Sequence, residues 1–116
     1  MNELEFKDFL TKELEDFSVR MQDDVKIITD KLAKDEVDDI LKCTIAVFEE
    51  IDADYLNLID TIGIEFDKHF TPEDNAELYE GIGQLLVDNT DKINGLKYEI
   101  GGLFVEVASE TLEGAE

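Results

Sequence analysis

The sequence predicts an all-α protein, an elongated antiparallel bundle of three long helices. Apolar residues recur at steps of three and four through most of the 116 residues, which is the period of an amphipathic helix. The one proline stands at position 72, so no proline interrupts the first two apolar stripes. Hydrophobic residues make up 43% of the chain, enough to build a core despite a net charge of −21. We expect a single helical domain over residues 1–116, with a frayed tail over 109–116.

The first predicted helix covers residues 2–34. Its apolar residues are separated by three or four positions, and most of its acidic residues fall on other faces. Residues 17–21 alternate between apolar and polar as a strand does, but the much longer stripe favours a helix. The stripe consists of Phe6, Leu10, Leu14, Phe17, Met21, Val25, Ile28 and Leu32.

The second predicted helix covers residues 35–69. Asp35 suits the N-cap position, and the acidic residues that follow it suit the positive end of the helix dipole. A helix of this length would measure roughly 50 Å. Its stripe consists of Val37, Ile40, Thr44, Val47, Ile51, Tyr55, Leu58, Ile62 and Phe66.

The third predicted helix begins at the clearest boundary signal in the chain. Thr71 suits the N-cap, and Pro72 suits the first helical position, where its missing N–H costs nothing. The acidic residues at positions 73 and 74 again complement the helix dipole. The stripe that follows consists of Leu78, Ile82, Leu85, Asn89, Ile93, Leu96, Ile100, Leu103 and Val107.

Five glycines lie inside this third segment, and each costs roughly 1 kcal/mol relative to alanine in a helix interior. For Gly81 and Gly83 we expect close helix packing as the explanation. Asn94-Gly95 has the residues of a helix end, so a third helix broken near Gly95 is left open beside an unbroken one. The pair at positions 101 and 102 also separates two strand-like runs, which makes an α+β fold with a C-terminal hairpin over 96–107 the alternative.

The many carboxylates do not form a recognisable catalytic or metal-binding motif. A di-iron bundle needs two Glu-x-x-His motifs, but the single histidine, His69, follows Glu65 by four residues. Asp52-x-Asp54 begins like a calcium loop, but the following positions lack the required ligand and glycine. The spacing of the glutamates at 49 and 50 also fails to match that of helical nucleotide pyrophosphatases. We expect no enzymatic activity, no catalytic residue, no metal and no cofactor.

Three further features bear on chemistry and location. Cys43 stands among apolar residues and is expected to be a small buried hydrophobe. His69 is expected to be a favourable charge at a helix end. The acidic N-terminal residues and the lack of a long apolar run predict a cytoplasmic protein, in a bacterial cell or a phage-infected host.

The negative charge is concentrated in the second part of the chain. Residues 1–42 hold 13 acidic and 7 basic groups, whereas residues 43–116 hold 18 acidic and 3 basic groups. Such a one-signed field destabilises a compact chain by self-repulsion, so the chain either tolerates it for solubility or uses it to bind a cationic partner. The predicted partner-binding residues, called the acidic surface below, are Glu49, Glu50, Asp52, Asp54, Asp60, Asp67, Glu73, Asp74, Glu77 and Glu80.

The charge density is comparable to that of DNA. B-DNA carries one negative charge per roughly 1.7 Å, and 21 net charges on a rod of about 50 Å give about one per 2.4 Å. In size, acidity and helical content the chain resembles phage-encoded DNA-mimic inhibitors of the anti-restriction and anti-CRISPR type. The resemblance rests on no shared motif, and it implies a DNA or RNA mimic that blocks a basic, nucleic-acid-binding protein.

Direct binding to nucleic acid or to an anionic membrane is excluded because the chain has no run of lysine or arginine. The alternative function is an acidic structural or assembly protein, such as an adaptor or chaperone, that self-associates through apolar helix faces. A homodimer stays open under either function.

Overall fold

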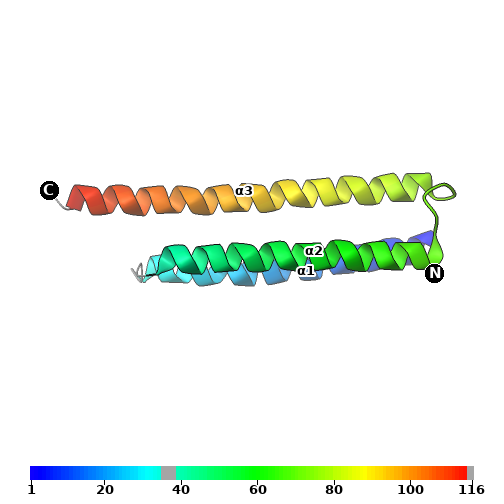
Figure 1. Ribbon diagram of the computed structural model, residues 1–116, viewed down its shortest axis with the longest axis horizontal. Coiled ribbons are helices and arrows are strands. Elements are labelled where there is room, and N and C mark those ends of the chain that lie inside the picture. The colour runs from blue at the N-terminus through cyan, green and yellow to red at the C-terminus, as the bar shows by residue number, and fades with distance from the viewer. Residues whose placement is uncertain (35–38, 115–116) are drawn as a thin grey trace. The chain divides into compact units, whose positions relative to one another are not determined.

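The computed structural model describes residues 1–34 and 39–114, with side chains as far as position 106. It contains the helices α1 (Glu3–Ala33), α2 (Ile40–His69) and α3 (Ala76–Gly114) and no strand in these ranges (Figure 1). The all-α class with three long helices is therefore confirmed. The contacts divide the chain into two units, Met1–Ala76 and Glu77–Glu116, which are described in turn. The single domain and the frayed tail stay predictions.

Helix α1 begins and ends within one residue of its predicted bounds. Asn2 is its N-cap, and the Asn2 side chain accepts a hydrogen bond of 2.8 Å from the backbone N–H of Glu5. The Glu5 carboxylate accepts a bond of 3.4 Å from the backbone N–H of Asn2, which completes a capping box. The buried residues of α1 all belong to the predicted stripe, namely Phe6, Leu10, Phe17 and Ile28, and the other four members of the stripe are half-buried.

Helix α2 begins five residues later than predicted. Asp39 occupies its N-cap position with a φ of 61°, in the left-handed region, and its side chain makes no capping hydrogen bond. The predicted cap, Asp35, lies outside the described residues. From Ile40 onward the predicted stripe is confirmed, because the buried residues of α2 are Ile40, Thr44, Val47, Ile51, Tyr55, Leu58, Ile62 and Phe66.

Helices α1 and α2 pack against each other as an antiparallel hairpin (Figure 1). Phe6 is fully buried at one end, where its ring centroid lies 6.0 Å from that of Phe66 and 5.4 Å from that of Phe70. Farther along, the rings of Phe17 and Tyr55 meet edge to face at 5.5 Å. Edge-to-face aromatic pairs add about 0.5–1.5 kcal/mol each beyond their buried area, so they fix the alignment of the two helices.

The segment after α2 is a turn, and α3 begins four residues later than predicted. The Thr71 hydroxyl does accept a hydrogen bond of 3.3 Å from the backbone N–H of Asp74, as a cap would. Asn75 fixes the turn on α1, because its side chain donates a bond of 2.9 Å to the Glu3 carboxylate. Pro72 therefore lies in this turn and is not the first residue of α3.

Helix α3 runs without interruption through Gly81, Gly83, Gly95 and the pair at 101 and 102. The break near Gly95 and the alternative hairpin over 96–107 are both wrong. A Cβ atom built on any of these glycines would have no neighbour within 4 Å. Close helix packing at Gly81 and Gly83 stays a prediction. The least exposed side chains of α3 follow the predicted stripe and are Leu78, Ile82, Ile93 and Ile100.

The open space at these glycines predicts that alanine stabilises the protein. Gly95→Ala and, in α2, Gly63→Ala should each raise the free energy of unfolding by about 1 kcal/mol, because alanine favours the helix without a clash. Urea denaturation followed by circular dichroism at 222 nm measures the change. A loss of stability in Gly95→Ala would contradict the continuous helix, because a helix-ending glycine resists this exchange.

Candidate partner-binding surface

The structure places the ten residues of the acidic surface on three elements. Six lie on α2, Glu73 and Asp74 lie in the turn after it, and Glu77 and Glu80 lie in the first turns of α3. Nine of the ten are exposed, and Asp54 is half-buried. Glu77 and Glu80 belong to the second unit, and the other eight residues belong to the first.

The six carboxylates on α2 point in three directions. At about 100° per residue, Glu49, Asp60 and Asp67 fall on the face opposite the buried stripe and are called the outer row. Glu50 and Asp54 fall on one flank of the helix, and Asp52 falls on the other. Neighbours in the outer row are about 16 Å and 10 Å apart along the helix, wider than the about 6 Å between i and i+4 side chains. The three directions follow from the helical spacing, but the half-burial of Asp54 does not.

Asp54 is engaged by the single arginine of the chain. Arg20 on α1 donates from Nε and Nη2 to the two carboxylate oxygens of Asp54, at 2.8 Å and 3.0 Å. This two-pronged geometry suits the planar guanidinium and joins the two helices of the hairpin. Asp54 is thus a structural ion-pair partner as well as an acidic residue. Arg20 is not among the predicted site residues, although it is the only arginine in a very acidic chain.

An acidic hollow surrounds this ion pair. It has a volume of about 340 Å³ and is lined by Arg20, Asp23, Asp24, Glu50 and Asp54. Partial burial raises the pKa of Asp24, and the nearby negative charges of Glu50, Asp54 and Asp23 raise it further, while Arg20 opposes the rise. Asp23 and Asp24 were not predicted as site residues because nothing in their spacing shows that α2 brings Glu50 and Asp54 beside them.

The described residues offer no metal-binding arrangement. Among the histidine, cysteine, aspartate and glutamate side chains of the described residues, no group of three could hold a metal ion. Cys43 is half-buried, so the prediction of a buried residue was wrong in degree. His69 lies in the last turn of α2, with Nε2 3.3 Å from a carboxylate oxygen of Glu65, which confirms its predicted place at a helix end.

The remaining findings concern membranes and related proteins. None of the helices, over the residues described, combines the length and apolarity needed to cross a bilayer. Comparison of the chain with protein-family models, curated proteins and solved structures gives no match.

The raised pKa of Asp24 predicts that ionised Asp24 lowers the free energy of unfolding, by an amount that depends on pH. Because the pKa is higher in the folded chain than in the unfolded chain, ionised Asp24 opposes folding above its folded pKa. Asp24→Asn should therefore raise the free energy of unfolding at pH 7, by no more than about 1 kcal/mol at so open a site. The gain should shrink as the pH falls through the folded pKa, and disappear below the unfolded value of about 3.9.

Urea denaturation of Asp24→Asn at pH 7 and pH 3 measures this dependence. Asp8→Asn is a matched control, because Asp8 is exposed on the outer face of the same helix. An equal rise in the free energy of unfolding of both variants at pH 7 would show a general relief of charge repulsion and no specific effect of the acidic hollow.

Proposed function

We propose that this chain is a non-enzymatic acidic protein that docks on a basic, nucleic-acid-binding protein and blocks its groove as a DNA or RNA mimic. The observation that carries the proposal is a net charge of −21, with nine of the ten predicted binding carboxylates exposed on helices or in the turn after α2. Exposed carboxylates can exchange water for the lysine and arginine side chains of a partner. The same charge excludes nucleic acid itself as the ligand, because like charges repel.

A helical scaffold suits this role. Helix α2 has 30 residues and a length of about 45 Å, which is comparable to about 13 base pairs at 3.4 Å per pair. Its backbone is fixed by its own hydrogen bonds and by packing on α1, so little ordering entropy is lost on binding. A dense negative field also speeds encounter with a positive groove and releases the anions bound there.

The hairpin offers more charge than the outer row alone. The outer row is too widely spaced to match successive phosphates, but the acidic hollow adds Asp23, Asp24 and Glu50 on a neighbouring face. We propose that the partner contacts the outer row and this flank together, and that Asp54 mainly holds Arg20 in place. The setting consistent with this function is the cytoplasm of a bacterium or phage-infected host, with a phage as the source of the inhibitor.

Salt and competition test the proposal. Immobilised protein should retain DNA- or RNA-binding proteins from a bacterial lysate at about 50 mM salt and lose them at about 500 mM, because the contacts are ionic. Adding double-stranded DNA or RNA should displace the same proteins, as measured by mass spectrometry of the eluates. Retention of the partner at high salt, or in excess nucleic acid, would contradict mimicry.

A charge-matched pair of variants separates a specific surface from net charge. Glu49→Gln, Asp60→Asn and Asp67→Asn together remove the outer row of α2. Glu15→Gln, Asp8→Asn and Asp30→Asn remove the same number and types of carboxylate from exposed positions on α1.

The α2 variant should lose at least about tenfold in affinity for the captured protein, since three ionic contacts of about 0.5 kcal/mol or more are removed. The α1 variant should lose much less. Equal losses of affinity in the two variants, measured by isothermal titration calorimetry, would mean that only the total charge matters. No loss of affinity in either variant would contradict the proposed surface.

A further inference from the structure

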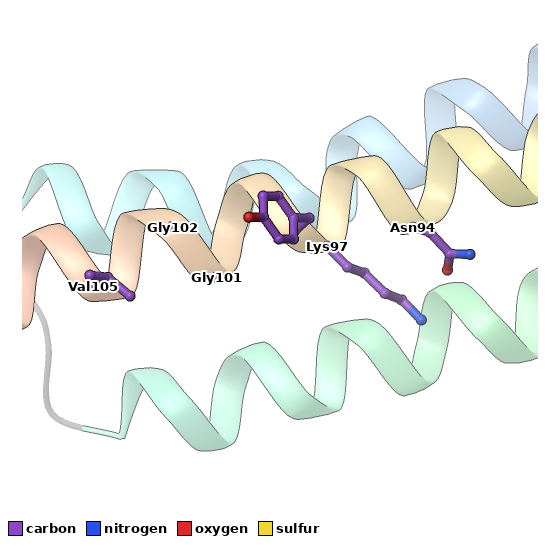
Figure 2. A pocket seen from close by; sticks show the side chains of 6 residues that line it. Asn94, Lys97, Gly101, Gly102 and Val105 are labelled. Carbon is purple, nitrogen blue, oxygen red and sulfur yellow. The ribbon is translucent and has the colours of Figure 1, made fainter.

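Helix α3 carries an apolar hollow of about 540 Å³ that belongs to this helix alone. It is lined by Asn94, Lys97, Tyr98, Gly101, Gly102 and Val105 and is called the α3 notch (Figure 2). Figure 2 shows the bare ribbon at the two glycines, between the side chains of Lys97 and Val105. The acidic surface includes none of these residues, so the function proposed above does not use the notch.

The floor of the notch has no side chains, and its walls are apolar. Gly101 and Gly102 contribute no side chain, and a Cβ atom added to either would have no neighbour within 4 Å. Tyr98, one turn before the glycines, is 85% exposed, and Val105, one turn after them, is 67% exposed. An aromatic ring so fully exposed to water, beside an open apolar hollow, can still bury apolar surface by binding a partner.

This face is separate from the apolar stripe of α3. At about 100° per residue, Tyr98 and Val105 lie about 140–160° around the helix from Ile82 and Ile100, which are 8% and 2% exposed. Val87, which is 54% exposed, continues the same face toward the start of the helix. Helix α3 is therefore apolar on two faces, and the stripe alone does not account for the second.

We propose that the α3 notch is a homodimer contact, in which α3 of a second copy crosses in the antiparallel direction. Tyr98 of each copy then fills the Gly101–Gly102 floor of the other. The surface is self-complementary because a projecting ring and a hollow lie about one turn apart on one face. A two-fold axis near position 100 places both rings in both hollows at once. The antiparallel direction also sets opposite ends of the two helix dipoles side by side.

The local charge favours a second copy over a cationic partner. Residues 92–105 contain two lysines, Lys92 and Lys97, and one glutamate, although the chain as a whole has a charge of −21. These lysines are the only basic residues after His69, so two copies repel each other least here. The same lysines repel the basic protein proposed above as a partner. The apolar lining therefore fits a copy of this chain.

A single helix crossing buries less than the roughly 1,200 Å² of a stable standard interface, so the dimer dissociates in the micromolar range or above. Added salt should strengthen it, because screening reduces repulsion between two acidic copies. The salt dependence is thus opposite in sign to that of the partner complex. Failure of either proposal leaves the other standing.

Sedimentation equilibrium of the full chain from about 5 μM to 1 mM, at low and high salt, tests the dimer. Tyr98→Ala should raise its dissociation constant by at least about tenfold, because a buried tyrosine at such a centre is a dominant contact. Tyr79→Ala is the control, since Tyr79 is exposed on α3 outside the notch. The proposal would be overturned if the chain were a monomer at every concentration, or if added salt weakened the dimer. An equal rise of the dissociation constant in Tyr98→Ala and Tyr79→Ala would also overturn it.

Crosslinking gives a second measurement that keeps the tyrosine. In a Cys43→Ser background, Gly101→Cys should form a disulfide between two copies under mild oxidation, because the two-fold axis passes close to it. Gly81→Cys, an exposed glycine of the same helix five turns away, should not. Equal crosslinking at positions 101 and 81 would show random collision and overturn the dimer geometry.

Discussion

The burial of one apolar stripe of α1 against one of α2 is the constraint on which the hairpin depends. Both stripes step by three and four, so Phe6, Phe17, Ile51 and Ile62 are all less than 2% exposed. The stripes are narrow, with eight buried residues among the 30 of α2. Most of each helix therefore faces water, and this wide outer area is what allows so many carboxylates to stay hydrated in a folded chain.

Ion pairs reduce the repulsion between carboxylates at a few places in the hairpin. Arg20 neutralises Asp54 across the helix pair, and Glu65 lies within 4 Å of Lys68 and His69, where the helix dipole already favours cations. Exposed pairs such as these add little free energy singly. Their position matters more, because Arg20 stands where carboxylates of both helices crowd together. The acidic residues thus divide into some that hold the fold and others that face only solvent.

Helix α3 shows how periodicity can outweigh local propensity. Its glycines and strand-like runs favour a hairpin, and each glycine costs roughly 1 kcal/mol in a helix. Its apolar residues nevertheless keep one helical face over about seven turns, and an interrupted helix would lose that continuous face. The glycines fall on other faces, where they meet open space. They disturb the helix little, and at Gly101 and Gly102 they leave the notch.

The sequence by itself determined the helical class, the three segments, and which face of α1 and of α2 is buried, because the apolar period is a local property of the chain. It also determined that nine of the ten predicted acidic residues are exposed, since charges avoid a narrow core. The tertiary structure alone decided where α2 and α3 begin. The apolar period does not encode the left-handed backbone conformation of Asp39 or the hydrogen bond between Asn75 and Glu3. The tertiary structure also decided that Arg20 meets Asp54, 34 residues away, and that Asp24 lies beside Glu50. Such pairings depend on how two helices align, and one-dimensional spacing does not contain that alignment.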